Sequence, residues 1–284
     1  MRSTQLTIQL KVITNHYNCT ATLFILPIIL LVGIFIYFSL NHALQINEYV
    51  LLQKNWFFYL NNQLGRYASF QYNTTQLGDA LIFLSILSMF IVYAPKMWEA
   101  LLTASLLSLI ISNILKTFFA VPRPSVMFNN NNFIIIGHKV AGLTSLPSGH
   151  AITVFTTLTV LLFSFMPRQL LYKFLVIACT VCIGTVVAFT RVAVGAHYPF
   201  DVIIGSIIGY SIGLMGIIIN KHYPIWGWIN KVSFYPIFII LLLGCSASII
   251  HKIYSHNLVI FYVALACLFF SLFKMIYVFI KKKN

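Results

Sequence analysis

The chain has 284 residues, of which 60% are hydrophobic and 8% charged, with a mean hydropathy of +0.91. This composition argues against a soluble domain, which needs far more polar surface. The net charge is +14, but the basic residues lie between apolar runs. Membrane orientation and anionic headgroups therefore explain the charge, and no nucleic-acid partner is expected.

Eight apolar runs follow one another along the chain. They cover about 22–40, 77–94, 99–120, 150–166, 173–190, 200–219, 232–250 and 257–280. Roughly 20 helical residues cross the hydrocarbon core of a bilayer, so each run predicts a span. We therefore predict an all-α fold, a polytopic transmembrane helical bundle. Residues 1–220 are expected to form the core, and residues 221–284 a C-terminal extension of two helices.

Residues 41–76, between the first two spans, combine aromatic side chains with Asn and Gln. Aromatic rings of this kind rest at headgroup depth, which predicts a loop or short helices in the membrane interface. Simple anchoring is the favoured explanation, and a rim through which a lipid enters is the alternative.

The basic residues also predict an orientation. If the spans alternate in direction, eleven of the 18 Lys and Arg fall on the side of the two chain ends. The positive-inside rule places that side, with the N- and C-termini, in the cytoplasm. The loops 121–149 and 191–199 and the outer end of the third span then share the extracytoplasmic side. Three polar stretches that are distant in sequence would therefore meet at one membrane face.

The last of these stretches, Thr190 to Asp201, carries three ionisable residues between apolar runs. Such residues are costly within a membrane unless they pair or bind a ligand. If the chain is helical from His197 onward, His197 and Asp201 lie one turn apart on the same face. The carboxylate could then hold one imidazole nitrogen and leave the other free to act as a nucleophile. His150, which ends the stretch LPSGH, is the candidate general acid for a leaving alkoxide.

The remaining candidates suit a phosphate group. Lys116 lies near the outer end of the third span, and Arg123 follows it beside two prolines. Arg123 and Arg191 can each offer a planar fork to phosphate oxygens. Ser148 and Gly149 begin the fourth span, where free backbone N–H groups and the positive end of the helix dipole favour an anion.

Neither a metal nor another cofactor is expected at this site. Asp201 is the only acidic residue in the three stretches, so they contain no carboxylate cluster for a divalent ion. Cys179 and Cys182 have no neighbouring His or Cys pair of the kind that a zinc site requires. Lys, Arg and helix ends would supply the electrostatic stabilisation instead.

Taken together, the three stretches resemble the signature of the type 2 phosphatidic-acid phosphatase family. Lys116–Pro124 is similar to its Lys-x6-Arg-Pro box and Leu146–His150 to its Pro-Ser-Gly-His box. Thr190–Asp201 is similar to its Ser-Arg-x5-His-x3-Asp box, with Thr190 where the family usually has Ser. The resemblance covers about residues 77–220 and, with the first span, implies a six-helix phosphatase core.

This resemblance implies metal-independent hydrolysis of a membrane lipid phosphate through a phosphohistidine. The intermediate would form at His197, and His150 would act as the acid. Lys116, Arg123, Ser148, Gly149 and Arg191 would bind the phosphate. The candidate substrates are phosphatidic acid, phosphatidylglycerol phosphate, undecaprenyl diphosphate and the phosphates of lipid A, at the outer side of a bacterial inner membrane.

Three alternatives stay open. The phosphohistidine could pass its phosphate to a second lipid, which would make the protein a phosphotransferase. The chain could also be a non-catalytic transporter or lipid-binding protein with a relic site. The vanadate-dependent peroxidases share the same boxes, but most of them are soluble. The sequence gives no indication of the oligomeric state.

Overall fold

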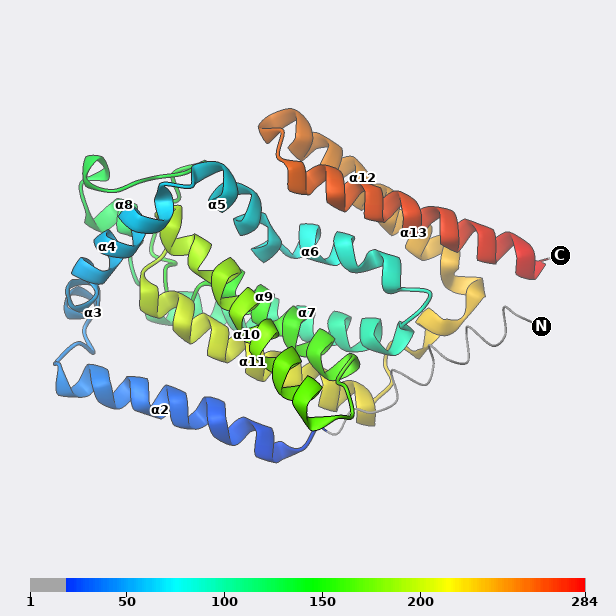
Figure 1. Ribbon diagram of the computed structural model, residues 1–284, viewed down its shortest axis with the longest axis horizontal. Coiled ribbons are helices and arrows are strands. Elements are labelled where there is room, and N and C mark those ends of the chain that lie inside the picture. Colours follow the sequence, from blue (N-terminus) through cyan, green and yellow to red (C-terminus); the bar gives the residue numbers. More distant parts are fainter. Residues whose placement is uncertain (1–18, 284) are drawn as a thin grey trace.

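The computed structural model describes residues 19–283, so residues 1–18, with Arg2 and Lys11, lie outside the described part. Within that part the chain is helical and contains no strand, which confirms the predicted all-α bundle (Figure 1). The apolar helices are α2 (Ile25–Leu40), α6 (Ala80–Leu87), α7 (Pro95–Phe119), α9 (Gly149–Ser164), α10 (Leu170–Ala193), α11 (Pro199–His222), α12 (Tyr235–His256) and α13 (Val259–Lys283). Each of the eight predicted runs therefore contains one helix.

Six described stretches are long and apolar enough to cross a membrane, and Ala80–Phe90 and Gly149–Ser164 are shorter apolar helices. The protein is an integral membrane protein. The second predicted span, 77–94, is shorter than expected because Asp79 caps α6 by accepting a hydrogen bond from Leu81 N at 2.9 Å. A 3-10 turn, η3 (Ser88–Phe90), then follows the helix.

Glycines bring α9 and α11 into close contact. A Cβ atom added at Gly209 would lie 2.5 Å from the carbonyl oxygen of Ile152, and one added at Gly213 would lie 2.6 Å from the Cβ of Thr159. Small residues let membrane helices approach closely, and packing between helices is what holds them together in lipid. Helix α7 packs against both, so α7, α9 and α11 form the centre of the bundle.

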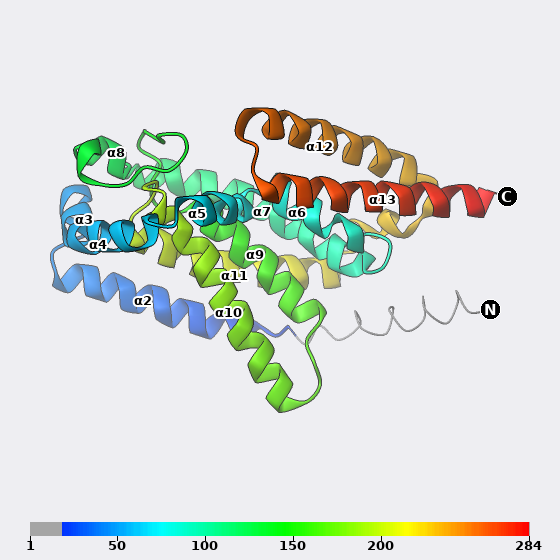
Figure 2. The same cartoon turned by 45° about the horizontal axis from the view of Figure 1, so that its top comes forward.

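The aromatic segment 41–76 was predicted to be either a loop or short helices, and it forms short helices. They are α3 (Ile46–Leu52), α4 (Lys54–Gly65), α5 (Ala68–Thr75) and the 3-10 turn η2 (Gln76–Gly78). They gather at one end of the bundle with α8 (Pro124–Met127) (Figure 2). Asn61 on α4 accepts from Ile134 N at 2.7 Å and donates to Val192 O at 3.0 Å. One buried amide thus joins the segment to the loop 121–149 and to the end of α10.

At the opposite end of the bundle, the fully buried Glu99 on α7 contacts α11 and the link that follows it. Its carboxylate accepts from Lys96 at 3.0 Å, from Asn220 at 3.2 Å and from Asn230 at 2.7 Å. The start of α7 and the end of α11 therefore lie at the same end of the bundle, as alternating span directions require. The hairpin α12–α13 packs along α6, on the side of the bundle away from α2 (Figure 1).

Candidate active site

His197 and Asp201 lie together at the end of the bundle that carries α3–α5. The imidazole Nδ1 is 3.5 Å from Asp201 Oδ2. The chain is not helical at His197, because α11 begins at Pro199, a favoured residue at the first helical position. Asp201 lies in the first turn, and its Oδ2 accepts from Tyr198 N at 3.0 Å. The carboxylate therefore reaches back to a histidine that precedes the helix.

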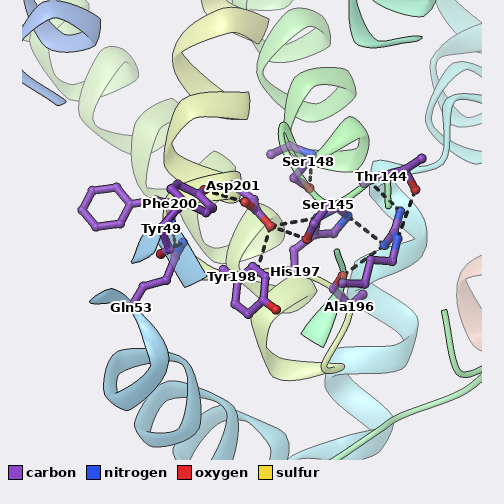
Figure 3. A network of polar contacts seen from close by, with 12 residues as sticks. Tyr49, Gln53, Thr144, Ser145, Ser148, Ala196, His197, Tyr198, Phe200 and Asp201 are labelled. Carbon is purple, nitrogen blue, oxygen red and sulfur yellow. Dashed lines mark hydrogen bonds and ion pairs between the residues drawn. The ribbon is translucent and has the colours of Figure 1, made fainter. Parts of the chain in front are cut away.

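Two further side chains hold Asp201 in place. Tyr49 on α3 donates to Oδ1 at 2.6 Å, and Ser145 donates to Oδ2 at 2.6 Å (Figure 3). All three residues are buried, so water does not compete for these bonds. Sequence reasoning missed both partners. Ser145 precedes Ser148 by three residues and was near enough to the motif to be considered, whereas no signal marks Tyr49.

Arg123 contacts the other side of the imidazole. It follows α7, and its Nη1 donates to Ala196 O at 3.0 Å and lies 3.2 Å from His197 Nε2. A guanidinium has no acceptor, so Nε2 must accept and the ring proton must be on Nδ1, facing Asp201. Arg123 Nη2 also donates to Thr144 O at 3.3 Å. The contact therefore fixes the tautomer that leaves the Nε2 lone pair available.

The pKa of His197 is held well below its ordinary value. Burial is the largest cause, and the positive charges of Arg123, Arg191 and Lys116 add to it. The imidazole is therefore neutral at physiological pH, which is the state that a nucleophile needs.

The start of α9 carries three of the predicted residues. Ser148 N donates to Asp201 O at 3.0 Å, and Ser148 Oγ caps the helix by accepting from Ala151 N at 3.5 Å. A Cβ atom added at Gly149 would lie 2.9 Å from Lys116 Nζ, so the absence of a side chain there leaves room for the ammonium group. The structure thus brings Lys116 to the N-terminus of α9, where both favour an anion.

His150 and Arg191 complete the cluster. His150 lies in the first turn of α9 and is near enough to Arg191, His197 and Lys116 to interact electrostatically with them. Arg191 belongs to the last turn of α10 and not to the link where the sequence placed it. Its Nη1 donates to Thr75 at 3.0 Å, while its buried Nε has no hydrogen-bond partner among the described residues.

The eight predicted site residues therefore lie at one end of the bundle. Two imidazoles, three cations and a helix N-terminus converge there, which suits an anion with several oxygens. No group of three or more His, Cys, Asp or Glu residues with the geometry of a metal site occurs within 19–283. Tyr49, Ser145 and Thr75 join the cluster from segments that carry no motif.

These features define a helical integral membrane protein with a buried polar site at one end of its bundle. Residues 98–225 match the PAP2 superfamily, that of the type 2 phosphatidic-acid phosphatases. The predicted family resemblance is thereby confirmed. The helices α12 and α13 follow the matched region.

Two curated relatives point in the same direction. The chain is 37% identical over 132 residues to a protein of Rhizobium etli named "Lipid A 1-phosphatase", which covers 45% of this chain and 52% of that protein. It is 36% identical over 115 residues to a protein of the same name from Rhizobium johnstonii, covering 39% and 42%. The chain thus spans about half the length of the curated relatives it matches. The crystal structure of Aquifex aeolicus LpxE is 25% identical, with a TM-score of 0.49, and covers 58% of this chain and 94% of that one.

Proposed function

We propose that the protein is a membrane phosphatase that hydrolyses a lipid phosphomonoester or diphosphate through a phosphohistidine at His197. The observation that carries this proposal is the position of one imidazole between Arg123, 3.2 Å from Nε2, and Asp201, 3.5 Å from Nδ1. The carboxylate orients the ring and can stabilise the imidazolium that forms. The guanidinium marks where the phosphate oxygens bind, next to the attacking nitrogen. Polar contacts of this kind often tighten only when the substrate is bound.

In the first step, phosphate oxygens replace His197 as the partner of Arg123, while Arg191 Nε supplies a buried donor that is not already used within the described part. Lys116 and the N–H groups at the start of α9 add positive potential. Nε2 attacks phosphorus in line, and the bond to the lipid oxygen breaks. His150, protonated for this step, gives its proton to the leaving alkoxide.

In the second step, the neutral His150 takes a proton from water, and the hydroxide attacks the phosphohistidine. The P–N bond breaks, inorganic phosphate leaves and His197 is regenerated with its Nε2 lone pair free. The catalytic residues of this proposal are His197, His150 and Asp201. Lys116, Arg123, Ser148, Gly149 and Arg191 bind the phosphate, and no metal or other cofactor takes part.

The relatives suggest which lipid to test first. Both carry the name Lipid A 1-phosphatase, so we propose the 1-phosphate of lipid A as the leading substrate. Phosphatidic acid, phosphatidylglycerol phosphate and undecaprenyl diphosphate are the other candidates. The distribution of Lys and Arg supports cytoplasmic termini and a site on the extracytoplasmic side of a bacterial inner membrane.

The test measures inorganic phosphate released by the purified protein from a panel of these four lipids. Wild-type protein should release phosphate from at least one of them, and His197→Ala should release none while still inserting into membranes. His222→Ala is the matched control, because that histidine is exposed at the other end of α11. Near-normal turnover by His197→Ala would refute the nucleophile. Loss of the substrate phosphate without free phosphate would favour transfer to a second lipid.

A further inference from the structure

The turn of the C-terminal hairpin contacts the chain close to the site. Lys252 Nζ on α12 lies 2.8 Å from Asp79 Oδ2, and the first turn of α13 donates from Ile260 N to Asn73 Oδ1 at 3.2 Å. The hydroxyl of Tyr72 is 3.3 Å from His256 Nδ1 at the end of α12. All three contacts fall within residues 72–79, where α5, η2 and α6 meet (Figure 1).

The opposite side of this short stretch contacts the site itself. Thr75 accepts the hydrogen bond from Arg191 Nη1 at 3.0 Å. A Cβ atom added at Gly78 would lie 2.6 Å from both Cβ and Cδ2 of His150, so the glycine backbone is pressed against that ring. Thr75 and Gly78 are both buried. One stretch of chain therefore lies between the hairpin and two of the proposed site residues.

Residues 72–79 comprise only the end of α5, the turn η2 and Asp79, so contacts with other helices help to hold them in place. η2 is a single 3-10 turn of three residues, and such turns have poorer hydrogen-bond geometry than an α-helix. Asp79, which follows it, uses its two oxygens for different tasks. Oδ1 caps α6 through Leu81 N, and Oδ2 pairs with Lys252. The ion pair is partly buried, with side chains 28% and 32% exposed, and it joins two elements that are far apart in sequence.

We propose that the hairpin α12–α13 is a positioning element of the active site. Through Asp79–Lys252 and Asn73–Ile260, it holds η2 so that Gly78 keeps the His150 ring directed at the leaving oxygen and Thr75 keeps Arg191 on the phosphate. This inference rests on the proposed phosphatase function. It assigns a role to two helices that lie outside the region matched by the family.

The role can be measured with two substrates that differ only in their need for an acid. An alkyl phosphate such as dodecyl phosphate must be protonated as it leaves, whereas nitrophenolate is a weak base that leaves without a proton. Both need Arg191. The first-step rate constant, measured at saturating ester as the alcohol released in a single turnover, excludes the later hydrolysis of the phosphohistidine, which also uses His150. A displaced His150 should therefore lower this first-step rate constant for the alkyl ester alone, and a displaced Arg191 should raise KM for both esters.

Two substitutions remove the ion pair between Asp79 and Lys252 without changing a residue of the proposed site. Asp79→Asn removes the charge but keeps a good N-cap for α6, and Lys252→Met removes the ammonium but keeps the length of the side chain. Each should lower the first-step rate constant for dodecyl phosphate about threefold to about tenfold, a fraction of the 10²–10⁴ that an acid contributes, with the first-step rate constant for nitrophenyl phosphate within about twofold of wild type. Lys252→Arg keeps the positive charge, so both rate constants should stay close to the wild-type values.

Two further variants complete the test. Gly78→Ala displaces His150 directly, so it should lower the rate with dodecyl phosphate more than Asp79→Asn does. Ser271→Ala is the control, since its hydroxyl lies 2.7 Å from Ser88 Oγ and links α13 to η3, beyond the far end of α6. It should leave the ratio of the two first-step rate constants unchanged.

The inference is overturned if Asp79→Asn and Lys252→Met change neither first-step rate constant, change both alike, or act no differently from Ser271→Ala. In these cases the wild-type protein is still active, so the proposed function stands. A wild-type protein that releases phosphate from no lipid and from neither test ester overturns the proposed function and this inference with it.

Discussion

Replacing Tyr49 by Phe tests whether the support of Asp201 matters for turnover. The substitution removes one hydroxyl that donates to Oδ1 at 2.6 Å and keeps the ring, which packs edge-on against Phe38. A hydrogen bond to a charged group contributes about 1.5–3 kcal/mol, and burial prevents water from replacing it. Because about 1.4 kcal/mol corresponds to tenfold in rate, kcat should fall between about tenfold and about hundredfold if the loss is felt in the transition state.

The neighbouring Tyr198 provides a matched control. Its side chain is fully buried in the same cluster, but its hydroxyl has no hydrogen-bond partner among the described residues. Tyr198→Phe therefore removes the same atom without breaking a bond, and kcat should stay within about twofold of wild type. The assay is phosphate release at saturating substrate, with the melting temperature of each variant measured alongside. The reasoning is refuted if Tyr49→Phe turns over like wild type, or if both variants lose activity equally.

Three other outcomes are expected. Activity should survive EDTA, and a loss that magnesium restores would contradict the metal-free mechanism. Because burial and three cations hold the pKa of His197 down, the neutral ring should persist at more acid pH, so the acid limb of kcat/KM should lie below pH ~6.5. Lys116→Met should move that limb upward, and comparing the two profiles cancels the titration of the substrate. Asn61→Ala leaves several buried backbone groups unpaired and should lower the free energy of unfolding by more than about 2 kcal/mol, seen as a lower melting temperature.

The order of the eight apolar helices was predictable, because a bilayer demands long apolar runs and the chain contains eight of them, although α6 and α9 are shorter than the full spans expected. The family could also be predicted from three short motifs. Helix boundaries were less accurate. Proline favours the first position of a helix, so Pro199 indicates that α11 starts after His197.

The supporting contacts could not be predicted. Tyr49 is 152 residues from Asp201, and Thr75 is 116 residues from Arg191, and neither belongs to a motif. Such contacts depend on how the interfacial helices fold back over the bundle, which no local pattern encodes. For the same reason, the prediction that residues 221–284 are a separate extension stays a prediction, while the contacts of Lys252 and Ile260 describe how that part meets the rest.

The glycine contact between α9 and α11 has a consequence for how the protein adapts to its membrane. The two helices start at the same level, since Ser148 N donates to Asp201 O, but α9 has 16 residues and α11 has 24. Tight packing along Gly205, Gly209 and Gly213 prevents either helix from sliding past the other. In a thicker or thinner bilayer the two must tilt together, and the mismatch in hydrophobic length is absorbed at their far ends. Because the starts of both helices carry the proposed site, we expect the geometry of that site to change little with bilayer thickness.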